Sequence, residues 1–310
     1  MRSSLNREQY GLALYYVCYF GATEICELLI CFGADVNFLA NYPATHPIHL
    51  LILSFIPPLL YSLFHRSLGH VSPLFIACYN AHPVCVDFLL ASGANANLAN
   101  VGDFSPLIAT AFLKGGKQFG FTLDQFIDNR CRCMRSLLGA GAAIDNTTHT
   151  GHTALNTSVW NRRLTEILIE SRANVNHLTI CLNSCLHRAV RLRSADVVKM
   201  LCESISHTDD VNVCGWSALM YACNAVNPAI VELLIDYGAN IDLVHSGGCT
   251  ALKIVMLKPS ISRYRVAVLQ LLAGSVEKRV MESSADWIRL ARIERNQHQD
   301  WVSSKKCWYV

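Results

Sequence analysis

The sequence has little charge and little imbalance between its positive and negative residues. Of the 310 residues, 16% are Asp, Glu, Lys or Arg, whereas 52% are hydrophobic. This composition excludes a disordered chain, which has few apolar residues and a high net charge, and a long coiled coil, which is rich in charged residues. Because 26 basic and 23 acidic residues leave only +3, we expect no nucleic-acid binding.

The sequence also lacks the spacings of metal, disulfide and catalytic motifs. It has 14 cysteines but no Cys-x-x-Cys pair, and zinc modules need ligands at short fixed spacings. It contains no nucleophile elbow, no phosphate-binding loop and no His-Glu-x-x-His sequence. We therefore expect no enzyme, no metal and no cofactor, and free thiols in a reducing compartment.

Long apolar runs are scarce, and one segment stands out. Residues 36–65 contain no Asp, Glu, Lys or Arg. Their apolar centre, 50–64, is shorter than the ~18–20 residues of a membrane-spanning helix, and Pro57-Pro58 interrupts it. Three interpretations of this insertion stay open: a membrane-associated segment, a folded insert over the neighbouring residues, or a stretch that is not native coding sequence. Because the first ten residues are polar and charged, we expect no signal peptide, and a cytoplasmic or nuclear location.

A short motif, Ser/Thr-x-Leu, recurs along most of the chain. Successive copies begin 33, 48, 31, 33 and 33 residues apart, so a period of 33 is broken mainly by a fifteen-residue insertion. The copies begin at Ser72, Ser105, Thr153, Ser184, Ser217 and Thr250. A second marker, Gly-Ala followed by Asp or Asn, recurs at Gly33–Asn37, Gly93–Asn97 and Gly238–Asp242.

This pattern resembles the ankyrin repeat, whose period is 33 residues and whose motif is Thr-Pro-Leu-His-x-Ala. The resemblance implies an all-α solenoid of about seven helix pairs. Repeat 1 covers 11–37, the apolar insertion 38–71, and repeats 2–7 cover 72–275, with an insertion at 115–129 inside repeat 3. Residues 276–310 are expected to form a C-terminal capping helix and tail. The insertion at 115–129 is predicted to be a surface loop.

The repeat assigns a role to most individual positions. The Ser or Thr that opens each copy can cap the first helix, and Pro73 and Pro106 then fall in its first turn. A glycine ends most second helices in the left-handed conformation, but Arg172 stands in that position in repeat 4. Either that helix ends differently, or Arg172 adopts the left-handed conformation at a cost of about 1 kcal/mol. Cysteines fall in positions where a small buried side chain fits: Cys18, Cys78 and Cys223 in first helices, and Cys26, Cys85 and Cys133 in second helices.

One set of residues, His177, Cys181, Cys185 and His187, has the ligand types of a metal site. In the ankyrin family, however, a His at the position of His187 typically makes structural hydrogen bonds, so no metal is expected. The Leu29–Asn37 segment also resembles a site at which asparagine is hydroxylated in several ankyrin proteins. Asn37 is therefore a possible hydroxylation site, unless its amide simply bonds the hairpin backbone.

The resemblance implies a non-catalytic protein–protein interaction scaffold that binds its partner on the concave face. The alternative is a substrate-recognition adaptor of a ubiquitin ligase, similar to ankyrin proteins that end in a SOCS box, although 276–310 shows no recognisable recruitment helix. A channel or an acyltransferase is excluded, since several membrane spans or an Asp-His-His-Cys motif would be needed. We expect a monomer that binds a peptide segment with apolar and acidic residues.

Aromatic and arginine residues recur at the two positions of the first helix that the family exposes on this face, and at the hairpin tips. Such residues dominate binding hot spots. The predicted partner-binding residues are Tyr16, Tyr19, Tyr79, Phe104, Phe112, Trp160, Arg188, Arg191 and Trp216. The alternative is that one of the two insertions folds over these rings and buries them as core.

Overall fold

The computed structural model describes residues 7–40, 70–112, 120–205, 208–258 and 263–277. Within these residues the chain forms fourteen helices in seven pairs. No strand occurs there, and only isolated bridges join Ala40 to Val71 and Val211 to Ser217. The all-α prediction is confirmed. The chain divides into two compact units, Met1–Asn174 and Val175–Val310.

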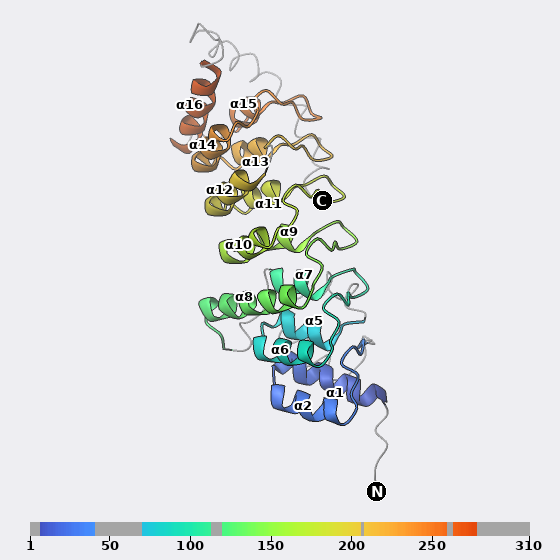
Figure 1. The fold of residues 1–310 in the computed structure, drawn as a ribbon. Coiled ribbons are helices and arrows are strands. Elements are labelled where there is room, and N and C mark those ends of the chain that lie inside the picture. Colours follow the sequence, from blue (N-terminus) through green and yellow to red (C-terminus); the bar gives the residue numbers. More distant parts are fainter. Residues whose placement is uncertain (1–6, 41–69, 113–119, 206–207, 259–262, 278–310) are drawn as a thin grey trace. The chain divides into compact units, whose positions relative to one another are not determined.

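The first unit stacks four helix pairs, each followed by a hairpin. In Figure 1 the second helices of the pairs form one layer, the first helices form the next, and the hairpins project on the far side of the first helices. The helices are α1 (Arg7–Phe20), α2 (Thr23–Cys31), α5 (Pro73–Tyr79), α6 (Pro83–Ala91), α7 (Pro106–Ala111), α8 (Leu123–Gly139), α9 (Ala154–Ser158) and α10 (Arg162–Glu170). First helices pack on first helices and second on second, as repeats that bury their apolar faces against neighbours must do.

The second unit repeats this arrangement in three pairs. They are α11 (Cys185–Arg191) with α12 (Ala195–Ser204), α13 (Ala218–Asn224) with α14 (Pro228–Asp236), and α15 (Ala251–Met256) with α16 (Arg263–Glu277). Here α13 packs between α11 and α15, and α14 packs between α12 and α16. The predicted capping helix, within 276–310, lies outside the described residues except for the last residues of α16.

The predicted caps of the first helices are present. Ser72 accepts a hydrogen bond from the Phe75 amide at 3.1 Å, and Ser105 accepts one from the Ile108 amide at 3.3 Å. Thr153, Ser184, Ser217 and Thr250 cap their helices in the same way. Pro73 and Pro106 occupy the first turns, where a missing N–H costs nothing.

The hairpins of successive repeats are joined by side-chain bonds that act as rungs. Asn37 accepts from the Asn95 amide at 2.7 Å, and its own Nδ2 donates to the Gly93 carbonyl at 3.3 Å. The equivalent Asn97 makes the same two bonds one repeat further on. In two further rungs Asp replaces Asn and only accepts: Asp145 from the Asn174 amide, and Asp209 from the Asn240 amide.

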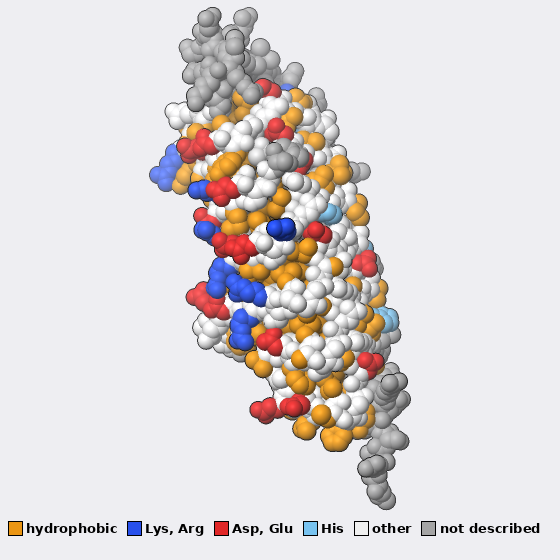
Figure 2. All heavy atoms as spheres, viewed as in Figure 1, with side chains coloured by type: hydrophobic (Ala, Val, Ile, Leu, Met, Phe, Trp, Pro, Cys, Tyr) orange, Lys and Arg blue, Asp and Glu red, His pale blue; other side chains and the backbone are white. Residues whose placement is uncertain are grey.

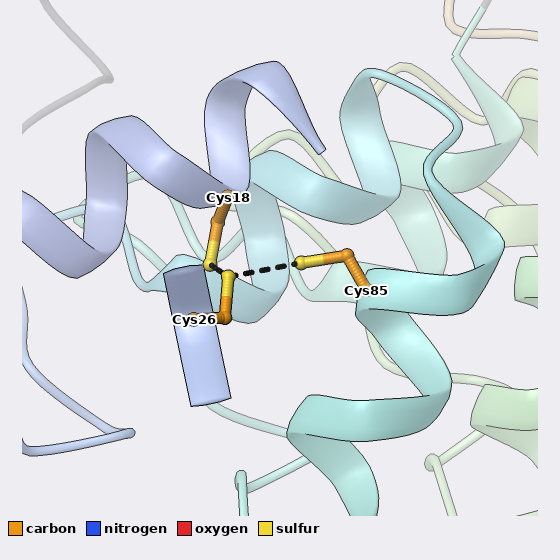
Figure 3. Close-up of side chains that lie close together, drawn as sticks. All are labelled: Cys18, Cys26 and Cys85. Carbon is orange, nitrogen blue, oxygen red and sulfur yellow. Dashed lines mark hydrogen bonds between the residues drawn. The ribbon is translucent and has the colours of Figure 1, made fainter. Parts of the chain in front are cut away.

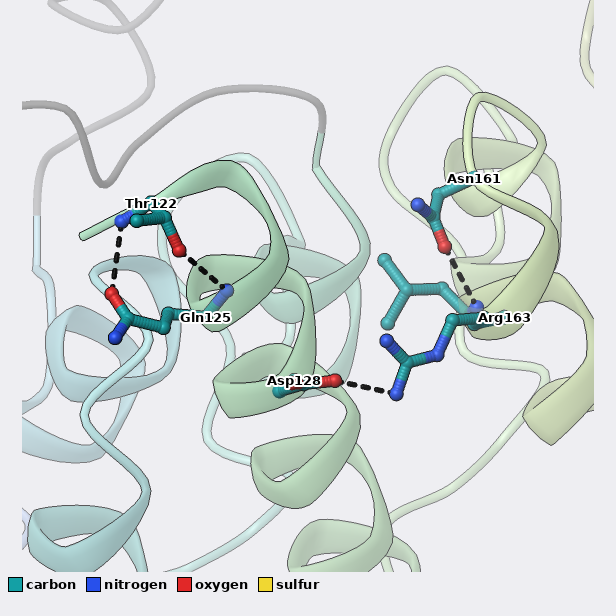
Figure 4. A network of polar contacts seen from close by, with 6 residues as sticks. Thr122, Gln125, Asp128, Asn161 and Arg163 are labelled. Atoms are coloured by element: carbon teal, nitrogen blue, oxygen red, sulfur yellow. Dashed lines mark hydrogen bonds and ion pairs between the residues drawn. The ribbon is translucent and has the colours of Figure 1, made fainter.

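In the insertion of repeat 3, the loop is shorter than the sequence predicted, because its second part is helical. The loop prediction for 115–129 was wrong from Leu123 onward, because these residues add turns to the start of α8, which has 17 residues. Thr122 and Gln125 form a reciprocal capping box that starts this extension (Figure 4). One turn later, Asp128 of α8 pairs with Arg163 of α10 at 2.5 Å, on the surface.

Arg130, on the same helix, is fully buried. Its guanidinium donates to the carbonyls of Thr110 (2.7 Å), Phe112 and Tyr79 (3.2 Å), which belong to the C-terminal ends of α7 and α5. It also lies 4.4 Å above the ring of Phe126. Burial lowers the pKa of Arg130 to about 10. One side chain therefore caps the ends of two first helices.

The described helices include none that is long and apolar enough to cross a membrane. Residues 41–69, which hold most of the apolar insertion, lie outside the described part of the chain.

The burial of Arg130 yields a stability prediction. Arg130→Ala leaves three helix-end carbonyls without this donor, and a hydrogen bond to a charged group is worth roughly 1.5–3 kcal/mol. We expect a loss of about 3 kcal/mol or more in the free energy of unfolding, measured by urea denaturation. Arg132→Ala, at an exposed position of the same helix, is the control and should change stability by less than about 0.5 kcal/mol. Equal effects of the two substitutions would contradict this role.

Arg172 provides a second stability prediction. Its φ is 66°, in the left-handed region where the equivalent Gly141 has 81° and Gly238 has 81°. A residue with a Cβ is strained there by about 1 kcal/mol, so Arg172→Gly should raise the melting temperature. Arg172→Ala keeps the Cβ and should give no such rise. A melting temperature that is unchanged or lowered in the glycine variant would count against this strain.

Candidate interaction surface

The predicted aromatic residues of the first unit differ in how far they are exposed. Tyr19 is only 8% exposed, and burial raises its pKa. Tyr16, Tyr79, Phe104 and Phe112 are partly exposed. The rings of Phe104 and Phe112 contact each other edge to face, with centroids 6.1 Å apart. These four aromatic rings of the first unit are therefore partly exposed, whereas Tyr19 is largely buried.

Trp160 has a structural contact in addition to its partial exposure. Its indole Nε1 donates to the Ala111 carbonyl at 2.8 Å, at the end of α7. The carbonyl of Tyr19, at the end of α1, accepts in the same manner from Asn80 and His82, each at 3.0 Å. Removing the Trp160 side chain would thus also remove a helix cap, so binding and stability could not be separated at this position.

The second unit contains a denser aromatic group, made by Trp216, Tyr221 and His245. The Trp216 ring stacks on His245 with centroids 5.1 Å apart and an interplanar angle of 14°. It also lies 5.1 Å from the ring of Tyr221. We call these three residues the aromatic platform. Trp216 comes from a hairpin tip and Tyr221 from α13, so the platform joins the two kinds of element on which the partner-binding residues were predicted.

Hydrogen bonds from buried side chains hold the platform in place. Asn212 accepts from the Trp216 amide at 3.0 Å and donates to the Tyr221 hydroxyl at 2.9 Å. His187 bonds the Trp216 carbonyl through Nε2 at 2.9 Å and Ser184 through Nδ1. Burial lowers the pKa of His187. This confirms that His187 makes structural hydrogen bonds, as the family motif implied.

The helix α11 carries two arginines, of which Arg191 borders the platform. The Arg191 guanidinium is 5.8 Å from the centre of the Tyr221 ring, and its side chain is exposed. Arg188 is half-buried, and its buried Nε has no hydrogen-bond partner. Burial, and then the neighbouring Arg191, lower the pKa of Arg188. In the described part of the chain neither arginine forms an ion pair, since the ion pair present there joins Arg163 to Asp128.

Tyr221 and His245 were not among the residues predicted from the sequence. Tyr221 occupies the first-helix position at which Tyr16 and Arg188 had been selected, so its signal was present in the repeat. His245 gives no such signal, because its place against Trp216 depends on how two successive hairpins pack. Of the residues predicted from the sequence, Trp160 lies in the first unit and Arg191 in the second.

Another basic group lies on a different layer. On the face drawn in Figure 2, Lys and Arg gather over α8 and α10. Arg132, Arg135, Arg162 and Arg163 are exposed on these second helices, and Asp128 pairs with Arg163. Because the candidate surface is built on first helices and hairpins, this group is not part of it.

Asn37, the possible hydroxylation site, forms the first rung between hairpins. Its side-chain amide makes two hydrogen bonds to the backbone of the next repeat. This is the structural role that was the alternative to hydroxylation. Hydroxylation of Asn37 stays a prediction.

Comparison with known proteins agrees with the geometry. The ankyrin-repeat family model matches residues 70–101, in the first unit, and 214–246, in the second. A putative ankyrin repeat protein of Rickettsia bellii is 31% identical over 112 residues, which are 34% of this chain and 32% of that protein. Glycerophosphocholine phosphodiesterase GDE1 of Candida albicans is 33% identical over 88 residues, 27% of this chain. The chain thus spans about a third of the first relative and 8% of the second.

Solved structures with similar folds are ankyrin-repeat domains. The human ASB11 ankyrin repeat domain has a TM-score of 0.61 at 23% identity and covers 83% of this chain and 96% of that domain. The ankyrin repeat domain of Bcl-3, a member of the IkappaB protein family, has a TM-score of 0.59 at 19% identity, covering 84% and 97%. Ankyrin-repeat domains bind other proteins, and this fold is typically non-catalytic. The repeat motif, the helix pairs and these matches together show that the chain is an ankyrin-repeat protein.

Proposed function

We propose that this protein is a non-catalytic interaction scaffold that binds an acidic peptide segment of its partner on the first-helix face of the second unit. The observation that carries the proposal is the pair of arginines on α11, Arg188 and Arg191, which have no ion-pair partner among the described residues and of which Arg191 borders the aromatic platform. A half-buried guanidinium without a counter-ion is costly. A carboxylate from a partner would offset that cost.

The platform supplies the apolar half of the site. Trp216 and Tyr221 are partly exposed, and aromatic residues beside Arg are characteristic of binding hot spots. An apolar side chain of the partner would pack on these rings, while its carboxylate would bond the guanidinium groups of Arg188 and Arg191. Charge-assisted bonds of this kind are about twice as strong as neutral ones.

The first unit offers a separate patch for the same type of contact. Tyr16, Tyr79, Phe104 and Phe112 are partly exposed there, without the arginine pair. We include these rings in the proposed partner-binding surface as apolar contacts. Tyr19 and Trp160 are less suited to it, since the first is largely buried and the second caps α7.

The adaptor alternative depends on a different part of the chain. A ubiquitin-ligase adaptor needs a recruitment segment, for which the sequence offers only 276–310. These residues lie almost entirely outside the described part of the chain, so no contact described above favours this alternative.

The binding prediction is best tested with peptides. A random-peptide phage library, selected on the full chain, should yield sequences that combine Asp or Glu with an apolar residue. Arg191→Glu should weaken binding of a selected peptide at least tenfold, since losing a charge-assisted bond costs roughly 1.5–3 kcal/mol. Replacing the peptide's acid by its amide should have a similar effect, measured by fluorescence anisotropy.

Lys199→Glu is the matched control, because it makes the same charge reversal at an exposed position of α12. It should change the affinity by less than about twofold at physiological salt, where exposed charges are screened beyond about 8 Å. Selection of neutral peptides, or equal effects of the two reversals, would refute the proposed site.

A further inference from the structure

Three cysteine side chains meet inside the first unit. Figure 3 shows the thiols of Cys18 on α1, Cys26 on α2 and Cys85 on α6 directed toward one point. The Sγ atoms of Cys18 and Cys26 are 3.5 Å apart, and those of Cys26 and Cys85 are 3.7 Å apart. All three sulfurs lie within 4.8 Å of one another. Each residue is 0% exposed.

The repeat explains why cysteines are buried here but not why three meet. Cys18, Cys78 and Cys223 share one position of the first helix, where a small residue is needed, and all three are 0% exposed. In the described part of the chain, only the group that contains Cys18 brings three metal-ligating side chains together. The clustering is therefore a property of this pair of repeats rather than of the repeat motif.

The spacing of the sulfurs fits a shared metal ion. A zinc–sulfur bond is about 2.3 Å long, so two thiolates on one ion lie roughly 3.8 Å apart at the tetrahedral angle and roughly 4.0 Å apart at the trigonal angle. The observed separations, 3.5 and 3.7 Å, are close to these values and far from the ~2.05 Å of a disulfide bond. We propose that Cys18, Cys26 and Cys85 form a binding site for a thiophilic cation with a filled d shell, Zn²⁺ or Cu⁺.

Binding would exchange protons for metal without any redox step. Three S–H bonds break, three metal–sulfur bonds form, and up to three protons pass to the solvent. Three thiolates leave a net charge of −1 around Zn²⁺ and −2 around Cu⁺. Burial therefore favours Zn²⁺, whose site carries the smaller net charge whether two or three thiols lose their protons.

The ion would join repeat 1 to repeat 2. Cys18 and Cys26 belong to the first helix pair and Cys85 to the second, so a single ion would cross-link α1, α2 and α6. The outward side of α2 exposes Ile25 (50%), Leu28 (57%) and Phe32 (70%), so repeat 1 has fewer packing contacts than an internal repeat. A ligand that binds only the folded state stabilises it, and this repeat would gain most from such a cross-link.

The test uses the full-length, reduced protein. It is titrated with Zn²⁺ and, in a second arm, with Cu⁺ supplied by a competing chelator, and bound ions are counted by native mass spectrometry. We expect one tightly held ion, a higher melting temperature and, by X-ray absorption, three sulfur ligands at about 2.3 Å. The metal is identified by the arm in which one ion is held by all three sulfurs. The absorption measurement needs no variant, so it decides the matter even if substitutions unfold the protein.

Cys18→Ala and Cys85→Ala should each lose the stoichiometric ion and the rise in melting temperature. Cys223→Ala is the matched control, since it removes an equally buried thiol from the same position of a first helix in the second unit, and it should keep both. The proposal is overturned if no ion binds, if the ion persists in the Cys18 or Cys85 variant, or if fewer than three sulfurs surround it. A Cys18–Cys26 disulfide in the peptide map of unreduced protein would overturn it as well.

Discussion

The structure depends on satisfying the backbone groups at the ends of very short helices. The first helices of repeats 2–7 have five to seven residues, and an α-helix leaves four N–H and four C=O groups unpaired at its ends. Such short helices therefore leave most of their own backbone N–H and C=O groups without a partner inside the helix. Ser or Thr caps supply acceptors at one end. At the other end, donors come from the next repeat for α1 and α7 and from the second helix of the same repeat for α7 and α15. Stacking is thus a requirement of hydrogen bonding as well as of apolar burial.

Arg130 shows how an insertion can be used to meet this requirement. The extended start of α8 places a guanidinium between the ends of α5 and α7, where one planar group with several donors serves both helices. Neutral groups also serve: Trp160 donates at the end of α7, and Asn80 and His82 at the end of α1. At the end of α15 the donor is again a guanidinium, that of Arg265. The aromatic rings predicted to bind a partner lie near these helix ends. Trp160 therefore also caps a helix, and Tyr19 is largely buried.

Features set by neighbouring residues could be predicted from the sequence, whereas those set by distant contacts could not. The Ser and Thr caps follow from positions within one repeat and the role of His187 from the family motif, and the structure confirms both. The repeat left two possibilities for Arg172, and the structure shows the left-handed one. The extension of α8 had a local signal, Thr122-x-x-Gln125, that the loop interpretation overlooked. Partners of Arg130 up to 51 residues away, the cysteine cluster and the stacking of His245 depend on packing between repeats, which the motif does not encode.

The asparagine rungs between hairpins can undergo side-chain deamidation, whereas the aspartate rungs cannot. Slow hydrolysis of the Asn37 amide to a carboxylate would preserve the acceptor for the Asn95 amide. It would also replace the Nδ2 donor by an oxygen facing the Gly93 carbonyl, now 3.3 Å away, and two acceptors repel each other. Asp145 and Asp209 already make their rungs as acceptors only. Ageing of the protein would therefore weaken the rungs of Asn37 and Asn97, both in the first unit, and leave the aspartate rungs intact.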